Sequence, residues 1–218
     1  MNIKSKILKF YEPMELDKNH RYRSWEHCYS YFSGQDVDIE YACLHLAFYL
    51  ASWGMYRGSS DLLQKDYLVH RDVVSQLIAN RHLMSASFIQ DKAESISEVF
   101  ELIEFIRKHY QKAMKMVRGR KREKPFIATD TLVTKILLGT LGCIPAYDRF
   151  FIDGMRISGI PYSSLSKSNF DKVIQFYLDN QREVDQAREV ITIKSGVQYP
   201  PMKLVDMYFW SVGNPEFN

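Results

Sequence analysis

The residues best suited to chemistry lie in one short stretch, "TLVTKILLGTLGCIPAYDRFF", which runs from Thr131 to Phe151. An apolar helical run breaks at Gly142, passes through Pro145 and then presents Asp148. Because proline suits the first turn of a helix, the sequence predicts that Asp148 lies in the first turn of a new helix. There it either stabilises the positive end of the helix dipole, by at most about 1 kcal/mol, or acts chemically. An ionised carboxylate in a partly dry cleft stabilises an oxocarbenium-like sugar or orients an attacking water.

Aromatic residues that would hold a flat ligand gather in "WGMYRGSS", residues 53–60. Trp53 and Tyr56 from this turn, with Tyr147 from the first stretch, are candidates for stacking a nucleic-acid base. Arg57 lies in the same glycine-bounded turn and is a candidate phosphate contact. Core packing is the competing interpretation of each ring, and the sequence leaves both open.

Positive charge is concentrated in one window. Residues 107–124 hold nine Lys or Arg and one Glu, a local charge of +8, so a net charge of +3 leaves −5 for the rest of the chain. At its centre, Arg118, Arg120, Lys121 and Arg122 are candidate contacts to the phosphates of a polyanionic partner. A solvated helix end and loop is the alternative interpretation.

Several kinds of site lack their motifs. The chain has no phosphate-binding loop, no dinucleotide fingerprint and no nucleophile elbow, and its six histidines show no metal-ligand spacing, so we expect no metal and no cofactor. "HRD" at residues 70–72 has Leu77 where a kinase catalytic loop needs Asn. The three cysteines are neither paired nor clustered, which is typical of the cytoplasm. We expect neither a signal peptide nor a membrane span.

The elements that must position these residues read as helices nearly throughout. The periodicity predicts a buried central helix over 42–53, a long amphipathic helix over 96–117 that Gly119 ends, and a helix that Thr129 or Asp130 caps and Gly142 ends. Ser59 or Ser60 is placed to cap the helix after the glycine-bounded turn. Further helices are expected from Ser168 to about Val190 and over 202–213. At most a minor strand pair is expected, and "EVITIKSGVQYP", residues 189–200, is the one place where a short strand could form.

The predicted fold class is therefore all-α, with little or no strand. Residues 1–218 form a single globular helical unit, open to a division into two lobes around a cleft near residues 50–60 and 142–150.

The stretch from Thr129 to Ile157 resembles the helix-hairpin-helix DNA glycosylase superfamily. In that family a lysine- or arginine-bearing helix leads through a glycine turn and a proline to a catalytic aspartate. On this resemblance Asp148 matches the aspartate, Pro145 the proline and Gly142 the turn glycine. Lys135 falls near the Schiff-base lysine of bifunctional members. The chain departs from the family because "KPFIATDTLVTK" lacks the glycines of the hairpin, and the interval from Lys135 to Asp148 is shorter.

The resemblance implies an enzyme that acts on double-stranded DNA, flips a modified nucleotide out of the duplex and cleaves its N-glycosidic bond. The alternative is a non-catalytic helical module that binds nucleic acid or another protein, for example as a component of a defence system.

Overall fold

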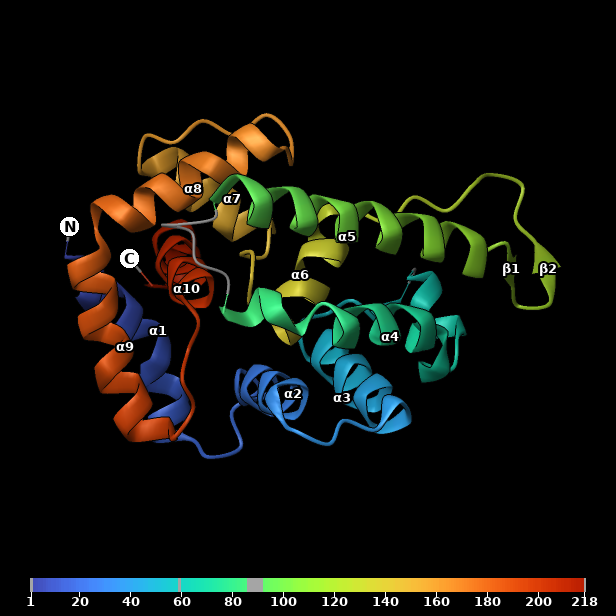
Figure 1. Ribbon diagram of the computed structural model, residues 1–218, viewed down its shortest axis with the longest axis horizontal. Helices are drawn as coiled ribbons and strands as arrows, with labels where there is room; N and C mark the ends of the chain where they lie inside the picture. The colour runs from blue at the N-terminus through green and yellow to red at the C-terminus, as the bar shows by residue number, and fades with distance from the viewer. Residues whose placement is uncertain (1, 59, 86–91, 218) are drawn as a thin grey trace.

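The computed structural model describes residues 2–58, 60–85 and 92–217. Within these ranges the chain forms ten α-helices and one two-stranded hairpin, which confirms the all-α class (Figure 1). The helices are α1 (Ile3–Leu16), α2 (Arg23–Ser33), α3 (Ile39–Ser52), α4 (Arg71–Ala79), α5 (Lys92–Ala113), α6 (Asp130–Thr140), α7 (Arg149–Ile157), α8 (Lys167–Asp179), α9 (Gln181–Ser195) and α10 (Pro201–Gly213). Short 3₁₀ turns are η1 (Asp61–Gln64), η2 (Tyr67–His70), η3 (Arg81–Ser85) and η4 (Pro215–Phe217).

Helix α6 begins and ends where the sequence predicts. The Thr129 hydroxyl accepts a hydrogen bond from the Leu132 amide at 3.2 Å, and so caps the helix. Gly142 follows with φ of +63°, the left-handed conformation that favours glycine, and its amide donates to the Leu137 carbonyl at 2.8 Å. These signals are local, so they could be predicted without knowledge of tertiary packing.

Helix α7 begins at Arg149, directly after Asp148, whereas the sequence predicts Asp148 within the first turn. Asp148 is extended, with φ −93° and ψ 177°, and its carboxylate accepts from the Phe151 amide at 3.1 Å. It is thus the N-cap residue and not part of the first turn, and Pro145 lies in the preceding turn. Aspartate is among the strongest N-cap residues, which explains why the helix starts directly after it.

The expected long helix over 96–117 is wrong at its C-terminal end. Helix α5 stops at Ala113, and the next residues form an antiparallel hairpin of β1 (Met116–Val117) and β2 (Arg120–Lys121). Arg118 and Gly119 both have positive φ, at 53° and 72°. Two such residues in succession make the tight turn that joins twisted strands, so Gly119 turns a hairpin instead of ending a helix.

Two other elements differ from the sequence prediction. The single helix expected from Ser168 to about Val190 is two helices, α8 and α9, which Asn180 separates. The short strand that the sequence allows over residues 189–200 does not form, because α9 continues to Ser195 and Gly196 ends it with φ of +71°. Val184, Ala187 and Ile191 are buried at helical spacing, and this packing outweighs the β-branched run.

Helix α3 is also less enclosed than expected. It packs against α2, α4, α6 and η2, yet Tyr41, Leu44 and Phe48 on its remaining face are 64, 48 and 61% exposed. The composition of this helix does not indicate which of its faces other helices cover.

The sequence offers Ser59 or Ser60 as the cap of the element that follows the glycine-bounded turn. Ser60 precedes η1, but its side chain does not cap that element, and Ser59 lies outside the described residues.

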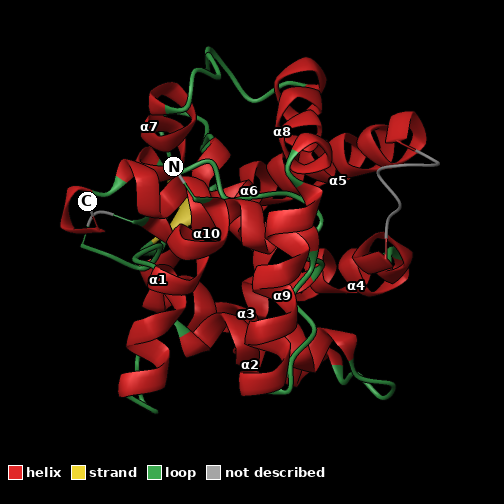
Figure 2. Ribbon diagram, turned by 90° about the vertical axis from the view of Figure 1, so that its left-hand side faces the viewer, coloured by secondary structure: helices red, strands yellow, loops and turns green. Residues whose placement is uncertain are grey.

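Helix α10 is the centre of the core. Every residue from Met202 to Gly213 is buried, and α1, α7, α8 and α9 pack around it (Figure 2). The closest approach is to α7, where a Cβ on Gly154 would overlap the Phe209 carbonyl and a Cβ on Gly213 would overlap that of Phe150. This crossing fixes α7, and with it Asp148, against α10. None of the helices in the described ranges is long and apolar enough to span a bilayer.

Candidate functional site

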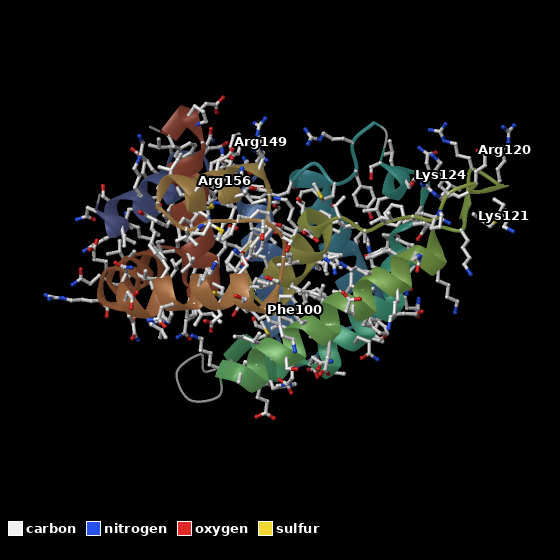
Figure 3. The ribbon with its side chains drawn as sticks, turned by 90° about the horizontal axis from the view of Figure 1, so that it is seen from above. Phe100, Arg120, Lys121, Lys124, Arg149 and Arg156 are labelled. Atoms are coloured by element: carbon white, nitrogen blue, oxygen red, sulfur yellow. The ribbon has the colours of Figure 1, made fainter. Side chains whose placement is uncertain are left out.

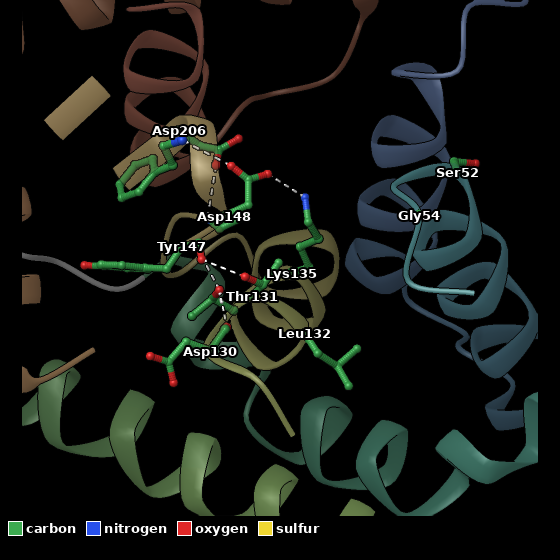
Figure 4. A network of polar contacts seen from close by, with 12 residues as sticks. Ser52, Gly54, Asp130, Thr131, Leu132, Lys135, Tyr147, Asp148 and Asp206 are labelled. Carbon is green, nitrogen blue, oxygen red and sulfur yellow. Dashed lines mark hydrogen bonds and ion pairs between the residues drawn. The ribbon is translucent and has the colours of Figure 1, made fainter. Parts of the chain in front are cut away.

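Lys135 and Asp148, which are thirteen residues apart in the chain, form an ion pair between α6 and the start of α7 (Figure 4). The Lys135 Nζ lies 2.9 Å from the Asp148 Oδ2, and their side chains are only 5% and 17% exposed. The other carboxylate oxygen of Asp148 caps α7. One carboxylate therefore has two partners, a backbone amide and an ammonium group, and each partner holds one of its oxygens.

A second ion pair, between Lys203 and Asp206 on α10, lies next to the first. Lys203 Nζ donates to Asp206 Oδ2 at 3.0 Å, and Asp206 Oδ1 accepts from the Ala146 amide at 3.0 Å. Since the Ala146 carbonyl in turn accepts from the Asp148 amide at 2.8 Å, Asp206 holds the turn that leads into Asp148. Burial lowers the pKa of Lys203 and raises the pKa of Asp206.

Aromatic rings wall this cluster of charges. Tyr49, Trp53 and Trp210 line a small cavity together with both lysines and both aspartates. Lys135 Nζ lies 4.8 Å from the centre of the Trp53 ring, and Lys203 Nζ lies 5.7 Å from it. The rings lower the cost of burying the ammonium groups through cation–π attraction.

The cavity is nearly closed. Its volume is about 10 Å³, which leaves room for about one water molecule. Trp53 is the C-cap residue of α3, and Gly54 directly after it has φ of +77°. The indole nitrogen of Trp53 is buried without a hydrogen-bond partner among the described residues. A ligand of the size of a base would therefore enter only if side chains that line the cavity moved.

The other two predicted base-stacking rings point elsewhere. The Tyr56 hydroxyl contacts Nε2 of the buried His70 at 2.7 Å, and burial raises the pKa of Tyr56 to about 12. Tyr147 is 1% exposed and packs against Phe151 and Tyr162, and its ring points away from Lys135 (Figure 4). Of the three rings, the structure brings only Trp53 to the Lys135–Asp148 pair.

The four predicted phosphate contacts lie on the hairpin at one end of the molecule (Figure 3). Arg118, Arg120 and Lys121 are exposed, whereas Arg122 is half-buried and forms an ion pair with Asp61. A groove of about 650 Å³ runs between the hairpin and the end of α5. Its cationic lining consists of Lys108, Lys112, Lys115, Lys121, Arg122 and Lys124.

A second groove lies beside the first. It has a volume of about 340 Å³ and is lined by Gly54, Arg57, Phe126 and Leu132, among others. Phe126 lines both grooves, so they adjoin, and Leu132 lies one helical turn before Lys135. Arg57, the remaining predicted phosphate contact, is exposed here, and its Nε donates to the Gly54 carbonyl at 3.1 Å.

Sequence reasoning missed the second ion pair. Lys203 and Asp206 stand three positions apart in the otherwise apolar "MKLVDMYFWSVG", and charges inside such a run are the available signal, because a buried helix carries them only in pairs. The nearest candidate partners of Asp148 in the sequence, Arg149 and Arg156, do not pair with it. Arg149 lies over the Phe150 ring at 4.5 Å, and Arg156 pairs with Asp153.

No group of three or more His, Cys, Asp or Glu in the described ranges is arranged to hold a metal ion. Comparison of the chain with known proteins gives no match among family models, curated proteins or solved structures. The glycosylase resemblance therefore rests on residues 129–157 alone.

Proposed function

We propose that this protein is a nucleic-acid N-glycosylase in which Asp148 is the working carboxylate. The observation that carries the proposal is the meeting of Lys135 and Asp148 in one aromatic-walled cavity. Residues of these types, within hydrogen-bond reach in a nearly dry site, match what cleavage of a base from a sugar needs. The basic groove beside the hairpin supplies a surface for a phosphate backbone.

The proposed reaction is a hydrolysis. The bond between C1′ and the base nitrogen breaks, and its electron pair leaves with the base. The Asp148 carboxylate stabilises the positive charge that develops on the sugar and accepts a proton from the attacking water. The water oxygen then bonds to C1′, and the departing base takes up a proton.

Lys135 would hold the Asp148 carboxylate in its orientation. If Lys135 first passes a proton to Asp148 and its amine then attacks C1′, as the Schiff-base lysine does in the bifunctional members of the resembled family, the bond from C1′ to the base breaks and a covalent intermediate forms that borohydride reduces to a stable adduct. The proposal requires the cavity to open, because about 10 Å³ admits no base.

The test compares base release from duplexes that carry deaminated, oxidised or alkylated bases. Asp148→Asn keeps a capping side chain but leaves the Lys135 ammonium buried without its ion partner, which typically costs about 3–5 kcal/mol of stability. The double variant Asp148→Asn/Lys135→Met removes that charge, so it should be more stable than the single variant. We expect wild type to release at least one base and the double variant to be folded but at least about 100-fold slower.

Absence of release by wild type from every duplex would refute the proposal, as would a double variant as active as wild type. Covalent trapping by borohydride that disappears in Lys135→Met would assign the nucleophile to Lys135.

Non-catalytic binding of nucleic acid is the second candidate. The closed cavity favours it, because about 10 Å³ admits no base. Under that proposal the hairpin grooves bind the phosphates and the four buried charges only fix the turn before α7. Binding to duplex without release of any base would support this function.

A further inference from the structure

The exposed face of α3 carries an apolar stripe that the proposed function does not use. Tyr41, Leu44 and Phe48 stand three and four positions apart, so they lie on one side of the helix, opposite the residues that face the core. The other faces of α3 pack against α2, α4, α6 and η2, and Figure 1 shows α2 and α3 side by side at one edge of the molecule. Three large apolar side chains in a row on a helix surface are typical of an interface.

The charges at the two ends of α3 are opposite in sign. Asp36, Asp38 and Glu40 lie exposed at its N-terminal end. At the C-terminal end the exposed Arg21 donates from its guanidinium to the Ser52 carbonyl at 3.0 Å. Such an arrangement complements the helix dipole, and it also makes the face self-complementary for a second helix that runs antiparallel.

The spacing of the apolar and charged residues agrees with one register. If Tyr41 of one copy faces Phe48 of a second copy, a two-fold axis passes beside Leu44, and the two Leu44 side chains meet. The same register brings the acidic N-terminal end of α3 in each copy toward the C-terminal end of α3 in the other, where the Ser52 carbonyl holds Arg21. The apolar centre and both charged ends are then satisfied together, which is the property of an isologous interface.

We propose that α3 is a homodimer interface in which two copies of this chain pair antiparallel through Tyr41, Leu44 and Phe48. A pair of 14-residue helices is small beside the roughly 1,600 Å² of a standard interface. The dimer is therefore weak, and we expect it to form at about 10–200 µM chain. This proposal is independent of the glycosylase function.

The first experiment measures molar mass by sedimentation over that concentration range. We expect the mass to rise from one chain to two for wild type. Phe48→Glu places a charge at one end of the stripe, opposite Tyr41 of the second copy, and should remain monomeric throughout. The matched control is Ile193→Glu on α9, whose side chain is 86% exposed in wild type and should leave the dimer unchanged.

The second experiment tests the register by exchanging charges. Asp36→Arg and Arg21→Glu each place like charges opposite one another, so each variant alone should dimerise at least about fivefold more weakly at low salt. In a mixture of the two, every contact is again between opposite charges, and dimers that contain one of each should form as tightly as wild type.

Wild type that stays monomeric up to 200 µM would overturn the proposal and leave the face to a different partner. A dimer that survives Phe48→Glu would place the interface elsewhere. Mixed variants that fail to recover affinity would refute the antiparallel register.

Discussion

At the scale of single residues, the site depends on charges that are buried only because they are paired. Two positive and two negative side chains line one cavity, namely those of Lys135, Lys203, Asp148 and Asp206. Removing one member leaves its partner desolvated, which generally costs more stability than the pair contributes. The sequence alone suggests that Asp148→Asn leaves the fold nearly intact. The ion pair with Lys135 changes that expectation, so activity must be compared in variants that remove both charges.

Among single residues, His70 should make the largest contribution to the pH dependence of stability. Its two ring nitrogens contact the hydroxyls of Tyr56 and Tyr110, and burial together with the neighbouring His109 lowers its pKa to about 3. An unfolded histidine has a pKa near 6.5, so between these values the unfolded chain binds the extra proton. The contribution of His70 to stability is therefore fully present above about pH 6.5 and is lost progressively as the pH falls toward 3.

We expect wild type to lose about 2–3 kcal/mol more unfolding free energy between pH 6.5 and 4.5 than His70→Gln, which has no group to titrate there. Urea unfolding at both pH values measures this difference, and the carboxylates titrate equally in both proteins. His27→Gln, at an exposed histidine, should behave like wild type. Parallel pH profiles for wild type and His70→Gln would contradict the assignment.

At the scale of elements, the crossing of α7 and α10 decides where Asp148 lies. Gly154→Ala and Gly213→Ala each force a methyl group into a backbone carbonyl of the facing helix, so we expect each to cost about 3 kcal/mol or more. Gly34→Ala is the control, because Gly34 has φ of −65° and its nearest such contact is 3.2 Å. Thermal or urea unfolding of the three variants gives the comparison, and a Gly154→Ala protein as stable as the control would show that the helices can separate without loss.

The same elements show what the sequence could and could not predict. The start of α6 at Thr129 and its end at Gly142 follow from caps within a few residues, and both were predicted. The meeting of Lys135 with Lys203 and Asp206 depends on how α6 and α10 pack, and no local pattern contains it. The break at Asn180 and the hairpin at Gly119 were missed for a related reason, since a glycine or asparagine permits several conformations and the surrounding structure selects one.

At the scale of the whole molecule, positive charge is concentrated at the hairpin and at the end of α5, and the rest of the chain is net negative. The window over 107–124 carries +8 while the remainder of the chain carries −5. Its exposed cations lie at the far end of the molecule from Arg149 and Arg156 on α7 (Figure 3). A polyanion drawn to the hairpin would lie in the larger groove, and the adjoining groove at Phe126 and Arg57 would guide it toward Trp53. Both candidate functions need this first step.

The salt dependence of duplex binding tests that step. Each phosphate neutralised on B-DNA lowers the logarithm of the binding constant by about 0.9 per unit of log salt concentration. Replacing Arg118, Arg120 and Lys121 by alanine should therefore reduce the slope by up to about 2.7 and weaken binding to every sequence alike. Arg122→Ala should have a smaller effect, because Asp61 already neutralises Arg122.

The matched control removes three exposed cations elsewhere, Lys18, Lys172 and Arg182, and so changes the net charge equally. Fluorescence anisotropy with a labelled duplex between 50 and roughly 200 mM salt measures all slopes. If the control flattens the slope as much as the hairpin variant, binding follows net charge and not the groove, and the hairpin is a solvated surface. If only the hairpin variant does so, the hairpin is where nucleic acid first contacts the protein.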